Sequence, residues 1–182
     1  GTFVVEVPWA LQIVKLNQFD NVYHEHVSEH SVLSFVKLAE IFDMQVVNVE
    51  KLPIHGGSLR VFLEFKANGS VPKPVVEQLV EEEREAGLFE RDTYVEFARK
   101  VEELRVNLIG MFDELKIKDK KVAGYGAPAK GNTLLNYFQI GSDRIDFLVD
   151  RNPLKQGLYS PGMKILIHST DAIATEKPDI LL

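Results

Sequence analysis

A strand, a glycine-rich turn and a helix follow one another between residues 122 and 138, and no other feature constrains the fold as strongly. Strands that alternate with helices along the chain form a parallel sheet. The elements expected here are a strand at 122–126, a loop at 127–131, a helix at 132–138, strands at 145–149, 164–167 and 179–182, and a helix from Ser169. The sequence therefore predicts a Rossmann-like parallel α/β domain in its second half.

The first 66 residues follow a different pattern. Strands are expected at 3–7, 45–52 and 58–65, and helices at 9–19 and 31–42, with Leu33, Val36 and Ile41 on one stripe of the second helix. Residues 58–65 alternate between apolar and polar side chains, so they should pair antiparallel with 45–52 across the turn at 53–57. Residues 67–74 have the composition of a linker, and helices are expected at 74–86 and 91–116. The acidic run Glu81–Glu83 reads as a solvated face.

Composition excludes several classes of function. The chain contains no cysteine, which excludes disulfides, cysteine-based zinc sites and a cysteine nucleophile within these 182 residues. A net charge of -6 argues against broad attraction to nucleic acid. No apolar run reaches the roughly 20 residues that cross a bilayer, and no signal peptide is visible, so we expect no membrane association and a cytoplasmic protein.

Three histidines lie within seven residues early in the chain, together with Tyr23 and Glu25. Tyr23-His24-Glu25-His26 is followed by His30 four residues later. Histidine titrates near neutral pH and tyrosine can relay a proton, so proton transfer is one interpretation, with Glu25 orienting a neighbour. A metal site and a polar surface segment are the alternatives. The spacing matches no known class of zinc site, and we expect no metal here.

Two further segments have the composition of ligand-binding loops. His55-Gly56-Gly57-Ser58-Leu59-Arg60 combines glycines with side chains suited to a phosphate or a sugar hydroxyl, although a plain hairpin turn explains it equally well. Gly124 to Thr133 places a glycine-rich turn at a helix start, with Lys130 adding positive charge. Asp150 ends the next strand, where dinucleotide-binding folds carry a ribose-binding acid, but the third glycine of that fingerprint is displaced.

Several motifs occur in the same order in one enzyme family. They are Glu6-Val7-Pro8-Trp9, Phe19-Asp20-Asn21-Val22-Tyr23-His24-Glu25-His26, His55-Gly56-Gly57-Ser58-Leu59-Arg60, Gly124-Tyr125-Gly126-Ala127-Pro128-Ala129-Lys130-Gly131-Asn132-Thr133, Asp150-Arg151-Asn152-Pro153-Leu154-Lys155-Gln156-Gly157 and Ser160-Pro161-Gly162. Over nearly its whole length the chain resembles the bacterial SAM-dependent C-methyltransferases of nucleotide-activated keto-deoxysugars.

The resemblance implies a domain organisation. Such enzymes have a cysteine-rich zinc domain, a SAM-binding domain and a C-terminal Rossmann-like domain. By this resemblance residues 1–66 form the C-terminal half of the SAM-dependent methyltransferase domain, 67–89 a linker and helix, and 90–182 a truncated Rossmann-like domain. Zinc would belong only to the cysteine-rich domain. The acidic Gly-x-Gly-x-Gly loop for S-adenosylmethionine is missing, so we expect this chain alone to be inactive.

The resemblance also implies a site. The substrate would be a nucleotide-diphosphate sugar with a ketone, methylated at the adjacent carbon, with His26 as the base, Tyr23 as relay or enolate stabiliser, and Glu25 beside them. The residues expected to bind the substrate are His55, Gly56, Gly57, Ser58, Arg60, Lys130, Asn132, Thr133 and Lys155. The alternatives are a fragment of an NAD-type oxidoreductase and a non-catalytic module that binds nucleotide sugars. If strand 3–7 has an open edge, residues 1–65 are expected either to associate with a second copy of the chain or to be its less ordered half.

Overall fold

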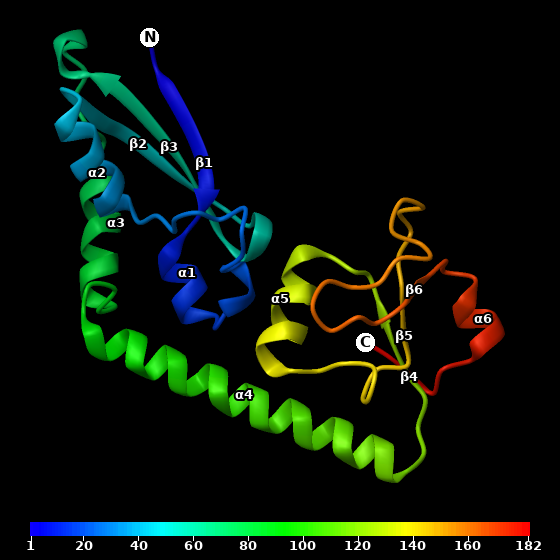
Figure 1. Ribbon diagram of the computed structural model, residues 1–182. Helices are drawn as coiled ribbons and strands as arrows, with labels where there is room; N and C mark the ends of the chain where they lie inside the picture. Colours follow the sequence, from blue (N-terminus) through cyan, green and yellow to red (C-terminus); the bar gives the residue numbers. More distant parts are fainter. The chain divides into compact units, whose positions relative to one another are not determined.

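The computed structural model describes all residues, 1–182, and divides into two compact units. Unit 1 comprises Gly1–Phe19 and His26–Lys100, and unit 2 comprises Asp20–Glu25 and Val101–Leu182. Each unit contains its own sheet, as Figure 1 shows. The short segment that carries Tyr23 and His24 is therefore grouped with the second half of the chain, although both of its flanks belong to the first.

Unit 1 is built on an antiparallel sheet of three strands. The strands are β1 (Phe3–Pro8), β2 (Met44–Leu52) and β3 (Ser58–Phe65), in the order β1-β3-β2. The predicted antiparallel pairing of β2 with β3 is confirmed, with Val49 opposite Val61. The alternation in β3 holds too, because Leu59, Val61 and Leu63 are all buried.

Unit 1 also contains three helices: α1 (Ala10–Lys15), α2 (Val32–Ile41) and α3 (Pro74–Glu85). Ser31 starts α2 with a capping box, and Pro74 takes the first position of α3, where its missing N–H costs nothing. Helix α1 ends earlier than predicted, since Asn17 has a positive φ of 53°. The remaining short elements are 3-10 turns at Phe19–Asn21, Ile54–Gly56 and Lys66–Asn68.

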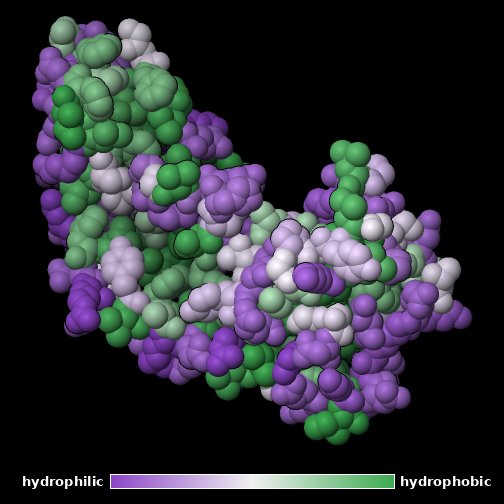
Figure 2. Space-filling view, in the orientation of Figure 1, coloured by the Kyte–Doolittle hydropathy of each residue, from purple (hydrophilic) through white to green (hydrophobic).

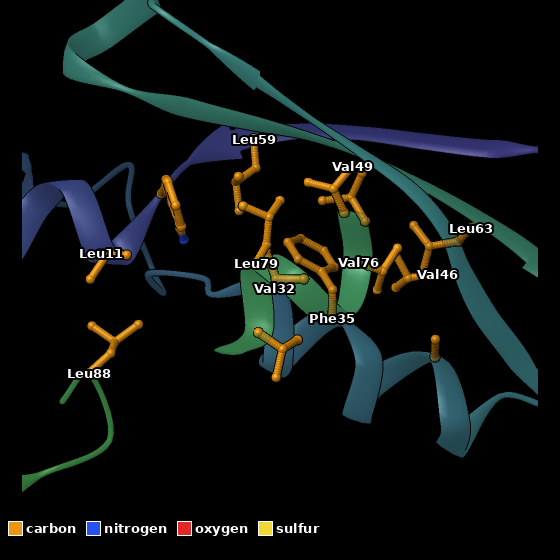
Figure 3. Packing of buried hydrophobic residues seen from close by; sticks show 14 residues of the cluster. Leu11, Val32, Phe35, Val46, Val49, Leu59, Leu63, Val76, Leu79 and Leu88 are labelled. Carbon is orange, nitrogen blue, oxygen red and sulfur yellow. The ribbon is translucent and has the colours of Figure 1, made fainter. Parts of the chain in front are cut away.

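The core of unit 1 lies between the sheet and helices α2 and α3 (Figure 3). Side chains of β2 and β3, such as Val49 and Leu59, meet Phe35 of α2 and Leu79 of α3 there. The predicted stripe of α2 holds only in part: Leu33 and Val36 are partly buried and pack against this core, whereas Ile41 is 75% exposed. The fully buried residues of the helix are Val32, Phe35 and Ala39.

The acidic run on α3 also differs from its prediction. Glu83 is fully buried, and its carboxylate accepts hydrogen bonds from the Trp9 indole N–H at 2.7 Å and from the backbone N–H groups of Val32 and Leu33 at 2.6 and 3.1 Å. The N–H groups in the first turn of a helix have no partner within that helix, so a carboxylate there satisfies them. Glu83 therefore joins α3 to the start of α2 and to Trp9.

A single long helix, α4 (Arg91–Ile117), carries the chain from one unit into the other. Residues 91–100 are grouped with unit 1 and residues 101–117 with unit 2. Its exposed surface carries ion pairs between residues three or four positions apart. In one of them Arg105 Nη2 lies 2.6 Å from Glu102 Oε1. Val101 and Phe112 are its buried residues, and its bounds agree with the helix predicted at 91–116 within one residue.

Unit 2 contains the predicted parallel sheet. Its strands are β4 (Val122–Tyr125), β5 (Phe147–Val149), β6 (Ile167–His168) and β7 (Ile180–Leu181), and its helices besides α4 are α5 (Ala129–Phe138) and α6 (Ala172–Glu176). All pairings are parallel, in the order β6-β5-β4-β7. The chain runs from β4 outward to β6 and then returns to the other side of β4, so the carboxyl end of β4 is a switch point of the kind where α/β folds bind ligands.

The predicted α/β class is thus confirmed, with an antiparallel sheet in one unit and a parallel sheet in the other. Figure 2 shows apolar atoms gathered at the upper end of unit 1, where β1 begins. The exposed apolar side chains of this unit include Phe3, Val4, Ile41, Phe42 and Phe65. None of the helices combines the length and the apolar character that crossing a membrane requires.

Candidate functional site

Unit 2 contains a cavity that brings two of the predicted motifs together. Its volume is about 410 Å³, and its lining residues are Tyr23, His24, Ala129, Asn132, Thr133, Asn136 and Pro161. Tyr23 and His24 come from the early histidine motif, and the next four residues lie on α5, beyond the glycine-rich turn. The rings of Tyr23 and His24 are in edge-to-face contact, with centroids 5.8 Å apart. The cavity is therefore lined by the side chains of Tyr23 and His24, by four residues of α5 and by Pro161.

Three polar side chains of α5 each donate a hydrogen bond to the backbone carbonyl four residues earlier. The Asn132 amide donates to the Pro128 carbonyl at 3.1 Å, and Thr133 Oγ1 donates to the Ala129 carbonyl at 3.2 Å. The amide of Asn136 donates to the carbonyls of Asn132 and Pro161, at 2.7 and 2.9 Å. Asn132 Oδ1 is buried and has no hydrogen-bond partner. A buried acceptor without a donor is costly, so this oxygen is a place where a ligand donor would be favourable.

Asp150, which follows β5, holds the glycine-rich turn before α5 through hydrogen bonds. Asp150 Oδ2 accepts from the Ala127 N–H at 2.9 Å and from Lys155 Nζ at 3.0 Å, and Oδ1 accepts from the Asn152 N–H at 2.9 Å. These hydrogen bonds, first those from the backbone, lower the pKa of Asp150 to about 2. Lys155 also donates to the Ala127 carbonyl at 2.9 Å. Asp150 Oδ2 thus holds the turn and Oδ1 holds the loop that follows β5, which is not the arrangement of a carboxylate offered to a ribose.

The predicted positive charge of the turn lies at the start of α5. Lys130 is half-buried in the first turn of the helix and forms no ion pair. It does not line the cavity. Lys155, by contrast, has its ammonium group on Asp150 and the Ala127 carbonyl. Of the two lysines predicted to bind substrate, Lys130 is the one whose charge no carboxylate offsets.

Two histidines of the motif each lie beside a different glutamate. His24 Nε2 lies 3.9 Å from Glu25 Oε1, with both side chains exposed. His26 Nδ1 lies 3.6 Å from Glu29 Oε1, with only 22% and 23% of the two side chains exposed. His30 Nε2 is 2.9 Å from Ser28 Oγ, and its ring packs against Phe35. Glu25 thus lies beside His24, and it is Glu29 that lies beside His26.

The shape of the turn between β2 and β3 explains why glycines stand at positions 56 and 57. Both residues have positive φ angles, 81° and 120°, in the turn between β2 and β3. A Cβ on Gly56 would overlap the Gln18 side chain, and one on Gly57 would lie 2.6 Å from Gln12 Cγ. Ser58 Oγ donates to the Ile54 carbonyl at 3.1 Å. The turn therefore needs these glycines for its own shape, with His55 exposed at its tip.

Arg60 lies on the sheet and is bound by carboxylates. Its Nη2 is 2.9 Å from Glu6 Oε2 and its Nη1 is 3.4 Å from Glu50 Oε2, which are its neighbours on β1 and β2. Opposite charges on adjacent strands stabilise a sheet. The described side chains form no group of three or more His, Asp or Glu placed to hold one metal ion.

Sequence reasoning missed four residues of the cavity. His24 was part of the motif but was given no role, and Ala129, Asn136 and Pro161 were not assigned to the site. The spacing of four between Asn132 and Asn136 was the available signal, because such residues share one face of a helix. Pro161 follows from its motif only when the fold is known, since the loop 150–166 returns to α5 through the Asn136 amide.

Comparison with known proteins gives two matches. Residues 53–182 match the family model described as "C-methyltransferase C-terminal domain". All 182 residues align with the "C-methyltransferase NovU" of Streptomyces niveus at 40% identity, covering 100% of this chain and 43% of that protein. The chain thus spans less than half the length of this relative.

Proposed function

Because the chain belongs to the C-methyltransferase family, we propose that it is the substrate-binding part of an enzyme that methylates carbon. The acceptor in this proposal is a nucleotide-diphosphate keto-deoxysugar, methylated at the carbon next to the ketone. The 40% identity to a C-methyltransferase over the full chain supports the reaction class. The sugar and its nucleotide come from the resemblance of the motifs.

Such a reaction needs a base. A carbon next to a ketone becomes a nucleophile when its proton is removed and the electron pair of the C–H bond passes to the carbonyl oxygen. His26 is the proposed base, because imidazole takes up a proton near neutral pH. Tyr23 relays the proton or donates to the developing oxyanion. Glu25, which lies beside His24, acts through that histidine in this proposal.

One observation carries the proposal: Tyr23 lines the same cavity as Asn132 and Thr133. The cavity of about 410 Å³ is of the size that takes a small molecule. Its short polar side chains suit sugar hydroxyls, and the buried Oδ1 of Asn132 offers an acceptor that no protein group occupies. Lys130, whose charge no carboxylate offsets, is the proposed partner of the diphosphate.

The remaining predicted residues have polar partners within the protein. Lys155 and the turn His55–Ser58 stay predictions as substrate contacts, since their polar groups also have structural partners. Arg60 would have to leave Glu6 and Glu50 to reach a substrate. We therefore concentrate the proposal on Tyr23, His26, Lys130, Asn132 and Thr133.

S-adenosylmethionine, the methyl donor that the proposal requires, does not fit the residues described. The paired glycines of unit 1 belong to a hairpin turn filled by Gln12 and Gln18, and the glycine-rich turn of unit 2 lacks an acid available for a ribose. The proposed role of this chain is therefore to bind the sugar and remove its proton.

Binding of a nucleotide-diphosphate sugar to this chain tests the proposal. Titration calorimetry with a uridine- or thymidine-diphosphate 4-keto-deoxysugar should detect binding that Asn132→Leu weakens about tenfold, since the variant removes the hydrogen-bond acceptor that the proposal assigns to the sugar. Asn107→Leu is the matched control, because Asn107 is exposed on α4. No binding, or equal affinity in both variants, would contradict the proposed cavity.

A further inference from the structure

We propose that Glu29 is the residue that orients His26, by holding the proton of its imidazole on Nδ1. The observation is the 3.6 Å approach of Glu29 Oε1 to His26 Nδ1, between two side chains that are each more than three-quarters buried. The inference rests on the proposed function in one respect only: His26 is taken as the base.

The position of Glu29 is fixed by its neighbours in unit 1. The carbonyl of His30 accepts from the Ala10 N–H at 2.9 Å, and residues 9 and 30 form a β-bridge. Ser31 then caps α2 through the Ser34 N–H. Because the backbone is held directly after Glu29, its carboxylate is presented from a fixed point and not from a free loop.

The other charged groups of the motif are engaged elsewhere. Glu25 lies beside the Nε2 of His24 at 3.9 Å, on the exposed side of the segment. His30 has Ser28 at its Nε2 and Phe35 against its ring. Among the carboxylates of this segment, Glu29 is thus the one placed at the ring of His26.

The chemical consequence follows from the two nitrogens of a neutral imidazole, one of which carries the proton while the other accepts. A carboxylate beside Nδ1 favours the Nδ1–H tautomer and leaves Nε2 as the acceptor. The 3.6 Å separation is longer than a hydrogen bond, but catalytic hydrogen bonds often shorten when substrate binds. Glu29 is therefore a positioning residue: it selects Nε2 as the nitrogen that takes the substrate proton.

Nitrogen-15 NMR of the labelled chain measures the tautomer directly. The chain has five histidines, and His26 is assigned by the ring signals that disappear in His26→Asn. We expect the Nδ1–H form of His26 to predominate in the unaltered chain. In Glu29→Leu the ratio of Nδ1–H to Nε2–H should fall at least about fivefold, because the acceptor is lost. Glu29→Gln, which keeps an oxygen acceptor, should retain more of the Nδ1–H form.

Controls separate orientation from folding and from the proposed function. Glu25→Gln, on the neighbouring histidine, should leave the His26 ratio unchanged, and Glu29→Ala replaces Glu29→Leu if leucine disturbs the fold. A predominant Nε2–H form in the unaltered chain, or a ratio that responds to Glu25 and not to Glu29, would overturn the inference. If the tautomer behaves as expected but His26 proves not to be the base, the proposed function fails while the orientation by Glu29 stands.

Discussion

The indole N–H of Trp9 donates to the carboxylate of Glu83 at 2.7 Å, and neither side chain is accessible to solvent. The two residues are 74 positions apart, so this hydrogen bond joins the end of β1 to α3. The same carboxylate caps the first turn of α2, which follows directly on the segment of His26 and Glu29. One buried carboxylate thus holds three elements of unit 1 together.

Replacing Glu83 should destabilise unit 1. Glu83→Ala leaves the Trp9 indole and the N–H groups of Val32 and Leu33 without their acceptor, at a cost of about 3 kcal/mol. Urea unfolding followed by tryptophan fluorescence measures it, because Trp9 is the sole tryptophan. Glu81→Ala is the control, since Glu81 forms only an exposed pair with Arg84 and should cost less than about 0.5 kcal/mol. Equal losses in the two variants would contradict the role given to Glu83.

Asp150 should make unit 2 sensitive to acid. Its pKa is lowered to about 2, so its contribution to stability is present above its ordinary pKa of about 4 and is lost as the pH falls toward 2. Asp150→Asn should cost at most about 2 kcal/mol at pH 7, and the difference between the two proteins should shrink below about pH 4. Hydrogen exchange of the Gly126 amide, which donates to the Val149 carbonyl, reports on this turn. A difference that does not change with pH would show that Asp150 is not the group responsible.

The open edge of β1 should promote self-association. β1 pairs with β3 on one side only, and Phe3 and Val4 are exposed. Unpaired strand edges with apolar side chains pair with other chains, and lysine on an edge suppresses this. Sedimentation velocity should therefore show a concentration-dependent dimer that Val4→Lys weakens. A monomer at every concentration would exclude pairing through this edge.

This chain alone should not bind S-adenosylmethionine. Neither of its glycine-rich turns has the arrangement for it, as the contacts of Gly56, Gly57 and Asp150 indicate. Calorimetry with the donor should give no heat of binding with the chain. Micromolar binding would mean that the turn before α5 has a role other than the one proposed.

The alternation of strands and helices was sufficient to predict most of the fold. Strand β3 alternates polar and apolar residues with a period of two that only Phe62 interrupts, and the region from β4 to β7 alternates strand and helix, so both sheets could be predicted. The face of α2 could be predicted only in part, because Leu33 and Val36 pack against the core and Ile41 does not. The helix has apolar residues on more than one side, and only packing against β2 and α3 selects Phe35 over Ile41.

The site was predictable only in part, for a similar reason. The motif from Tyr23 to His26 and the polar residues of α5 could be identified as candidates from residue type. That Tyr23 and Asn132 line one cavity depends on long-range packing, which no local pattern encodes. The burial of Glu83 was also hidden, because its partners are an indole 74 residues away and the N–H groups of another helix.

The central claim is that His26 removes a proton from the carbon beside a ketone. The test is solvent-deuterium exchange at that carbon of a nucleotide-diphosphate 4-keto-deoxysugar, measured without S-adenosylmethionine. The protein assayed is a longer enzyme that contains this chain and has the length of the relative from Streptomyces niveus. Exchange should occur in the unaltered enzyme and fall by about 10²–10⁴-fold in His26→Asn, the usual contribution of a positioned base. Exchange at the same rate in His26→Asn would show that the base lies elsewhere.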